Sequence, residues 1–186
     1  MLEAVVFAIH DSGFVARCAL EEDDGAQVRI DKIYSILEAC RLGIHDVSET
    51  SLDATLGLPR FNMPLELGVF LGARRFGSTR QRRKSCLVLD RERYRYQAYL
   101  SDLAGQDIKA HGGEPARAIR AVRNWLSHHV SPGVMLPGPA KMVDRHARFL
   151  ADLPTLLAAV GIDRDELIYN DFTTLLVGWL RENPRG

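Results

Sequence analysis

The sequence is poor in cysteine and has no apolar run long enough to cross a bilayer. Its 186 residues include three cysteines, Cys18, Cys40 and Cys86, which are far apart in the chain and odd in number. This pattern argues against a disulfide framework and a cysteine metal site, and it favours reduced thiols in a cytoplasmic protein. Because a membrane helix needs roughly 20 consecutive apolar residues, we expect no membrane association.

An excess of charge of either sign is also lacking. The chain has 24 basic and 24 acidic residues, so its formal net charge is zero. A neutral protein has no overall field that attracts nucleic acid or a membrane surface. Nucleic acid is therefore not an expected partner.

The cations are nevertheless unevenly distributed. A solvated loop and a phosphate-binding patch both fit a dense basic run. The zero net charge favours the solvated loop, and tyrosines interleaved with the arginines keep base stacking as a minor alternative. The run consists of Arg74, Arg75, Arg80, Arg82, Arg83, Lys84, Arg91, Arg93 and Arg95, and the tyrosines are Tyr94, Tyr96 and Tyr99.

Three familiar catalytic patterns are absent as well. The sequence shows no Ser/His/Asp triad order, no glycine-rich phosphate loop and no ligand spacing for zinc. We therefore expect neither a bound metal nor a cofactor. The remaining candidates for chemistry are carboxylates.

The spacing of apolar residues predicts an α/β fold. Residues 3–9 form a continuous β-branched and aromatic run, which predicts a strand covered on both faces rather than a signal peptide. Alternation of strands and helices predicts a doubly wound (flavodoxin-like) parallel sheet of four to five strands. The other expected strands are 44–47, 86–89 and a short piece at 107–109, and the expected helices are about 28–41, 63–76, 92–104 and 114–129.

Proline and glycine mark a boundary late in the chain. The segments Ser131-Pro132-Gly133 and Leu136-Pro137-Gly138-Pro139 break any regular element and predict a linker. Residues 1–130 are therefore expected to form the α/β domain. Residues 139–186 should form a small C-terminal helical appendage.

The segment from Asn62 to Gly72 places one carboxylate in an otherwise apolar helix. Its large residues leave no polar face, so the helix should be buried. Glu66 lies among them, although a glutamate is almost never fully buried without a partner. With Asn62 as the cap and Pro64 just after it, Glu66 should lie in the first turn, where the helix dipole helps to keep it ionised.

Polar residues are expected to gather where the predicted strands end. In an open parallel sheet, ligands bind at the carboxyl ends of the strands. Gly68, a small residue two positions after Glu66, is suited to a helix that faces a ligand across a cleft. The candidate ligand-binding residues are His10, Asp11, Ser12 and Arg17 after the first strand, Asp46 and Ser48 after the second, and Arg60 and Asn62 before the Glu66 helix.

Two of these segments carry a family resemblance. Gly43-Ile44-His45-Asp46-Val47-Ser48, followed by Asn62-Met63-Pro64-Leu65-Glu66-Leu67-Gly68 and the strand Cys86-Leu87-Val88-Leu89, resembles the nucleoside 2-deoxyribosyltransferase family. Related TIR-like domains that cleave NAD also place a glutamate on a helix in this region. The resemblance implies that Glu66 is the nucleophile on the sugar C1′ and that Asp46 is the acid at the end of a strand. It also implies a homo-oligomer.

The chain departs from the transferase pattern at one point. Transferases usually carry another acid shortly before the glutamate, where this chain has Arg60 and Asn62. The resemblance therefore implies cleavage or transfer at an N-glycosidic bond of a nucleoside, nucleotide or NAD.

The residues leave alternatives open. The same cleft could sense a nucleotide without cleaving it and signal through the helical appendage. Glu66 could be a structural acid with a buried cation as its partner, and Asp46 could be a turn residue at the end of a strand. His45 is expected to be a hydrogen-bonded core histidine.

Overall fold

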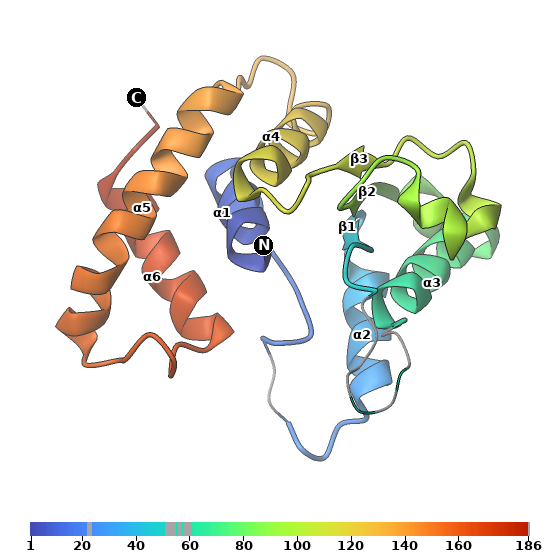
Figure 1. The fold of residues 1–186 in the computed structure, drawn as a ribbon, viewed down its shortest axis with the longest axis horizontal. Coiled ribbons are helices and arrows are strands. Elements are labelled where there is room, and N and C mark those ends of the chain that lie inside the picture. Colours follow the sequence, from blue (N-terminus) through green and yellow to red (C-terminus); the bar gives the residue numbers. More distant parts are fainter. Residues whose placement is uncertain (22–23, 51–54, 56, 58–60, 186) are drawn as a thin grey trace. The chain divides into compact units, whose positions relative to one another are not determined.

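The computed structural model describes residues 1–21, 24–50, 55, 57 and 61–185. The described residues form six α-helices and a three-stranded parallel sheet, which is a mixed α/β fold (Figure 1). The contacts of the chain divide it into two compact units. The sheet unit is Asp24–Gly113, and the helical unit combines Met1–Asp23 with Glu114–Gly186.

The sheet unit contains the three strands in sequential order. Strand β2 lies between β1 and β3, and both pairings are parallel. Three short 3₁₀ turns lie in the connections before and after β2. The elements are α2 (Arg29–Ala39), β1 (Leu42–Asp46), α3 (Asn62–Phe76), β2 (Ser85–Asp90) and β3 (Lys109–Ala110).

Helix α3 packs on β1 and contacts α2 (Figure 1). The buried side chains of this core come from both layers and are Val47, Leu67, Val88 and Tyr96. Phe70 of α3 is completely buried and lies against Gly43 of β1, where a Cβ atom would come within 2.8 Å of the phenyl ring. Glycine at this position therefore lets α3 approach the sheet closely.

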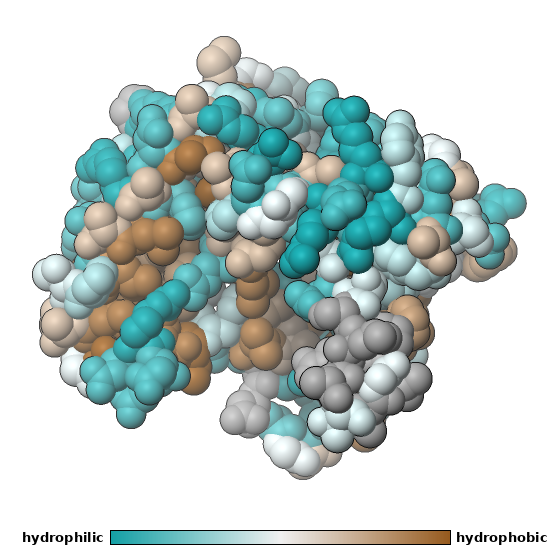
Figure 2. Space-filling model, viewed as in Figure 1, coloured by the Kyte–Doolittle hydropathy of each residue, from teal (hydrophilic) through white to brown (hydrophobic). Residues whose placement is uncertain are grey.

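The helical unit consists of α1 (Leu2–Asp11), α4 (Pro115–Leu126), α5 (Pro139–Val160) and α6 (Tyr169–Glu182). Helix α1 packs against the other three helices. Its Phe7 lies 5.8 Å from the ring of Phe149, which in turn lies 5.5 Å from Trp179. Apolar side chains also gather on the surface that α5 and α6 present in Figure 2.

The prediction of a strand at residues 3–9 is wrong, because this segment lies within α1. A short run that is apolar at every position has no period that separates a buried strand from a buried helix. Ala4 through Ala8 are all buried, as expected for a helix surrounded by other helices. The described residues consequently contain three strands instead of the expected four to five.

The prediction of a helix at 92–104 is also wrong. The segment forms two 3₁₀ turns, Arg95–Ala98 and Ser101–Leu103. Tyr94 has φ of 64°, which lies in the left-handed region and interrupts a right-handed helix. The predicted helices at 28–41, 63–76 and 114–129 correspond to α2, α3 and α4 with shifts of a few residues at their ends.

The two units do not follow the boundary expected near residue 130. Helices α1 and α4 group with α5 and α6, because α1 and α4 both contact α5. Among the helices that the structure describes, none combines the length and apolar character needed to cross a bilayer.

Candidate functional site

Strands β1 and β2 both end in aspartate, and a histidine follows β3. Asp46 is the last residue of β1, Asp90 is the last residue of β2, and His111 comes directly after β3. Because the strands are parallel and adjacent, these three residues lie at one edge of the sheet. This is the carboxyl edge, where open α/β sheets bind their ligands.

Asp90 is held in a buried ion pair. Its side chain is fully buried, and the guanidinium of Arg95 donates to Oδ1 from Nε at 2.9 Å and from Nη2 at 2.5 Å. The hydroxyl of Tyr99 lies 3.1 Å from Oδ2. Burial is the largest cause of a raised pKa at Tyr99, and the Asp90 carboxylate raises it further. Asp90 is thus fixed inside the protein by charged and polar partners.

Arg95 also organises the segment that follows β1. Its guanidinium donates to the hydroxyl of Thr50 at 2.8 Å and to the carbonyl of Ser48 at 2.7 Å. The Tyr99 hydroxyl lies 2.8 Å from the carbonyl oxygen of Val47. Arg95 and Tyr99 therefore tie the end of β1 to the end of β2 and shape the carboxyl edge.

Asp46 is the more exposed of the two aspartates, with 26% of its side chain accessible. Its Oδ1 accepts the backbone N–H of Ser48 at 3.1 Å and lies 3.3 Å from Nε2 of His111. The other ring nitrogen of His111 accepts the N–H of Gly113 at 3.0 Å. Since Nδ1 is an acceptor, the proton of the neutral ring is on Nε2, which then donates to Asp46.

Glu66 is the fifth residue of α3. The sequence predicted Asn62 as the cap and Glu66 in the first turn, but the N-cap position is Phe61 and Asn62 is the first helical residue. Glu66 thus lies just beyond the first turn, where the helix dipole contributes less. The carboxylate is partly buried, and among the described residues no hydrogen bond or ion pair holds it.

Burial raises the pKa of Glu66, and the guanidinium of Arg29 at the start of α2 partly opposes this increase. The carboxylate is therefore less stable as an anion than one in water, and a cationic or electrophilic ligand would interact with it strongly. Leu67 of α3 belongs to the core cluster that contains Val47, and Met63 packs against the same cluster, so the first turns of α3 lie near the end of β1.

The other candidates of the sheet unit have simpler environments. Asn62 and Gly68 are exposed on α3, and a Cβ atom added to Gly68 would meet nothing within 4 Å. Ser48 lies in the turn that its backbone N–H makes with Asp46. Arg60 lies outside the described residues.

The candidates before residue 20 belong to the helical unit, since His10 and Asp11 are the last residues of α1 and the others follow it. Asp11 is fully buried and pairs with Arg145, whose Nη2 lies 3.0 Å from Oδ1. Burial raises the pKa of Asp11, and Arg145 opposes the increase. Nε of Arg17 donates a hydrogen bond to Oε1 of Glu21 at 2.7 Å.

His10 and Ser12 complete this group. His10 accepts the backbone N–H of Ala16 at 3.4 Å. Ser12 is buried, and its hydroxyl has no hydrogen-bond partner within the part of the chain that the structure describes. His10 and Asp11 border a cavity of about 290 Å³ with Arg145 and Arg185, so these residues form a cluster of their own within the helical unit.

His45 is buried as expected, with 3% of its surface exposed, but the expected hydrogen bonds are absent in the described part of the chain. Its ring packs edge-on against Phe70, with centroids 5.2 Å apart. Burial lowers the pKa of His45 to about 4, and the ammonium of Lys84 contributes to the decrease. His45 is thus a neutral core residue and not part of the carboxyl edge.

Sequence reasoning missed His111 and misjudged Arg95 and Tyr99. A histidine between a short extended segment and the pair Gly112-Gly113 was the available signal for His111, since both glycines have positive φ and turn the chain back at the strand end. Arg95 and Tyr99 were assigned to a basic run and its interleaved tyrosines, but both bind Asp90.

The described residues include no group of three or more histidine, cysteine, aspartate or glutamate side chains placed to hold a metal ion. No family model, no curated protein and no solved structure matches this chain. The resemblance to the nucleoside 2-deoxyribosyltransferases therefore rests on the motif residues alone.

Proposed function

We propose that the sheet unit cleaves or transfers at an N-glycosidic bond of a nucleoside, nucleotide or NAD, with Glu66 as the reacting carboxylate. One observation carries this proposal: Glu66 is partly buried, has a raised pKa, and is free of ion pairs and hydrogen bonds to other described residues. A carboxylate whose role was structural would be expected to have such a partner.

The proposed reaction follows the logic of retaining glycosidases. The Glu66 carboxylate approaches C1′ of the sugar, the bond from C1′ to the base nitrogen breaks, and its electron pair leaves with the base. The carboxylate either forms a glycosyl ester or stabilises the oxocarbenium-like centre. Water, or the hydroxyl or nitrogen of an acceptor, then takes the sugar. Nicotinamide leaves NAD as a neutral molecule, so this substrate needs no proton from the protein.

Asp46 has a supporting role in the proposal. Its partly exposed carboxylate can accept a hydrogen bond from a sugar hydroxyl, while His111 fixes the orientation of the side chain. Asp90 is not assigned a role in the reaction, because Arg95 neutralises it and no part of its side chain is exposed.

The proposal extends to the fold and to assembly. A doubly wound, flavodoxin-like arrangement is supported by the parallel order β1-β2-β3, which is the order that successive right-handed crossovers produce on one side of such a sheet. The proposed ligand is a nucleoside, nucleotide or NAD, the protein is proposed to act as a homo-oligomer in the cytoplasm, and no separate cofactor is required.

Release of free base tests the proposed activity. The purified chain is incubated with NAD and with a panel of nucleosides, and products are separated by chromatography. We expect base release that Glu66→Gln abolishes and that Asp102→Asn, an exposed acid of the same unit, leaves unchanged. Intact substrates throughout the panel, at protein concentrations at which the chain self-associates, would contradict the proposal.

A sensing role is the second candidate. The fixed Asp90 leaves the carboxyl edge with one partly exposed aspartate, and an enzyme that must also protonate its leaving group would be expected to use a second acid. Saturable binding of an unchanged ligand, retained in Glu66→Gln, would favour this candidate over cleavage.

A further inference from the structure

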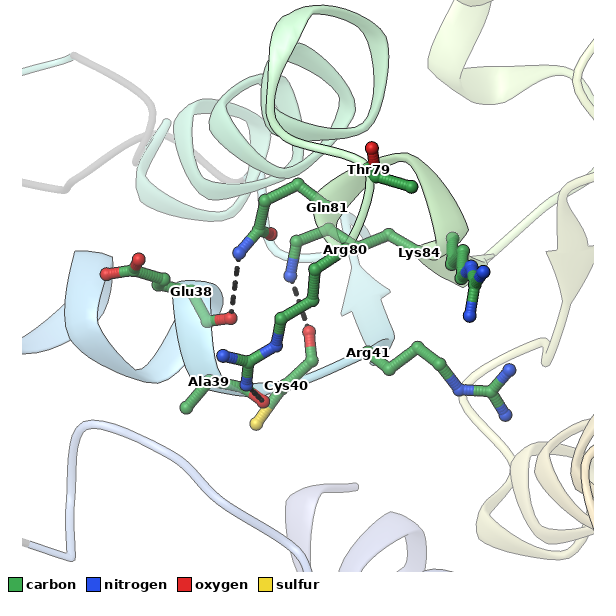
Figure 3. Close-up of a pocket in the computed structure, with 9 residues that line it drawn as sticks. Glu38, Ala39, Cys40, Arg41, Thr79, Arg80, Gln81 and Lys84 are labelled. Carbon is green, nitrogen blue, oxygen red and sulfur yellow. Dashed lines mark hydrogen bonds between the residues drawn. The ribbon is translucent and has the colours of Figure 1, made fainter.

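The sheet unit has a cavity of its own, at the end of the sheet where β1 and β2 begin, which we call the amino edge. It has a volume of about 400 Å³ and is lined by the end of α2 and by residues that precede β1 and β2 (Figure 3). Arg41 directly precedes β1 and Lys84 directly precedes β2, and the N–H of Ser85 donates to the carbonyl of Arg41 at 3.0 Å. Asp46 ends β1, so this cavity and the carboxyl edge are at opposite ends of the same strand.

Three side chains that line the cavity cap the C-terminal end of α2 by hydrogen bonding to its carbonyl groups. The last turn of a helix leaves carbonyl groups without partners. Lys84, Gln81 and Arg80 donate to these carbonyls, and Figure 3 shows their side chains directed towards the end of α2. The accepting carbonyl groups belong to Leu37, Glu38, Ala39 and Cys40.

Two other cations that line the cavity, Arg41 and Arg83, do not cap α2. Arg41 and Arg83 are exposed, and among the described residues neither guanidinium makes a hydrogen bond or an ion pair. In Figure 3, Arg41 extends away from the end of α2. Each guanidinium carries five N–H donors in a planar fork that matches a phosphate group.

The lining has an excess of positive charge. Four cations, Arg41, Arg80, Arg83 and Lys84, face a single acid, Glu38. Burial lowers the pKa of Lys84, and the Arg80 guanidinium lowers it further, whereas Glu38 raises it. An anion in the cavity would reduce this repulsion between neighbouring cations.

We propose that this cavity binds a phosphate-bearing ligand of nucleotide size, held chiefly by Arg41 and Arg83. The volume of about 400 Å³ lies within the range of small-molecule sites. Bidentate contacts from the guanidiniums of Arg41 and Arg83 supply the recognition of the phosphate. The site does not depend on Glu66 and is distinct from the proposed glycosidic chemistry at the other edge of the sheet.

Calorimetric titration of the full chain tests the site. Inorganic pyrophosphate and ADP serve as probes at about 50 mM salt, where electrostatic binding is not yet strongly screened. Pyrophosphate has no glycosidic bond, so its binding is measured whether or not Glu66 is catalytic. We expect saturable binding that Arg41→Gln with Arg83→Gln weakens by about tenfold or more.

A matched double variant is the control. Arg75→Gln with Arg93→Gln removes the same charge from the same unit, at exposed positions outside the cavity lining. We expect this variant to bind within about twofold of the native chain, because its cations lie outside the cavity. Absence of saturable binding, or an equal loss in both double variants, would overturn the proposal.

A third probe distinguishes a free nucleotide from a nucleic acid as the phosphate-bearing ligand. A single-stranded oligonucleotide of roughly 12 nucleotides presents the same phosphate chemistry as part of a polymer. Tighter binding of the oligonucleotide than of ADP, lost in Arg41→Gln with Arg83→Gln, would assign the site to nucleic acid. Tighter binding of ADP would assign it to a free nucleotide.

Discussion

The imidazole of His111 reaches back from the end of β3 to the carboxylate at the end of β1, with Nε2 3.3 Å from Oδ1 of Asp46. The backbone N–H of His111 donates to the carbonyl of Asp90 at 2.9 Å, so the histidine is fixed to β2 as well. A single residue thus connects the ends of all three strands. The contacts of His111 with Asp46 and Asp90 bring the three strand ends together, and no sequence pattern indicates them.

The tautomer of His111 is the first testable consequence. We expect the neutral ring to carry its proton on Nε2, because Nδ1 accepts the N–H of Gly113. A nitrogen–proton correlation spectrum of the histidine side chains measures the tautomer directly. In Asp46→Ala the Nε2 proton should exchange faster with water, since its acceptor is gone. A proton on Nδ1 would contradict the geometry.

The second prediction concerns the stability cost of Glu66. Its pKa in the folded chain is raised above 4.5, so the fold prefers the neutral form, and stability decreases as the pH rises through the folded pKa. Glu66→Gln should therefore stabilise the protein at pH 7, by about 1 kcal/mol or less because the group is partly solvated. Urea unfolding measures the difference.

Unfolding of the native chain and of Glu66→Gln at low pH is the control for this prediction. Below the ordinary glutamate pKa of 4.5 both chains carry a neutral group, so the stabilisation by Glu66→Gln should disappear. Asp102→Asn, at an exposed position, should show no such gain. A destabilising Glu66→Gln at pH 7 would indicate that the carboxylate has a structural partner.

The third prediction concerns the ion pair of Asp90 and Arg95. Arg95→Met should destabilise the protein by about 3–5 kcal/mol, because it leaves a buried carboxylate without its cation. Adding Asp90→Asn should recover part of this loss, since the uncompensated charge is then removed. A double-mutant cycle from urea unfolding gives the coupling, and additive losses would show that the pair does not interact.

The fourth prediction concerns His45 and acid. The pKa of His45 falls from 6.5 to about 4 in the folded chain, so the unfolded chain binds the proton more readily. Stability should therefore be fully present above pH 6.5 and decrease as the pH falls towards 4. The expected loss is at most about 3 kcal/mol.

Substitution of His45 separates its effect from those of other groups. His45→Leu keeps an apolar side chain in the core and should remove this part of the acid sensitivity. His128→Gln, at an exposed position, should retain it. An unchanged pH profile in His45→Leu would show that another group is responsible.

Much of the sheet unit was predictable from local patterns. Helix α3 was found because its apolar residues extend over several turns, and β2 was found because a short apolar segment follows a basic loop. The segment 92–104 was misassigned because a left-handed Tyr94 and the contacts of Arg95 with Asp90 override its helical spacing. Such contacts join residues that the sequence pattern treats independently.

The sequence by itself determined which segments are apolar, that a helix follows Phe61, and that one carboxylate lies within it, because these properties depend on neighbours along the chain. Tertiary structure decided that residues 3–9 form a helix, because a run that is apolar throughout takes its conformation from what surrounds it. It also decided that Arg95 holds Asp90 while His111 meets Asp46, because these pairs are made by the parallel strands and not by sequence spacing.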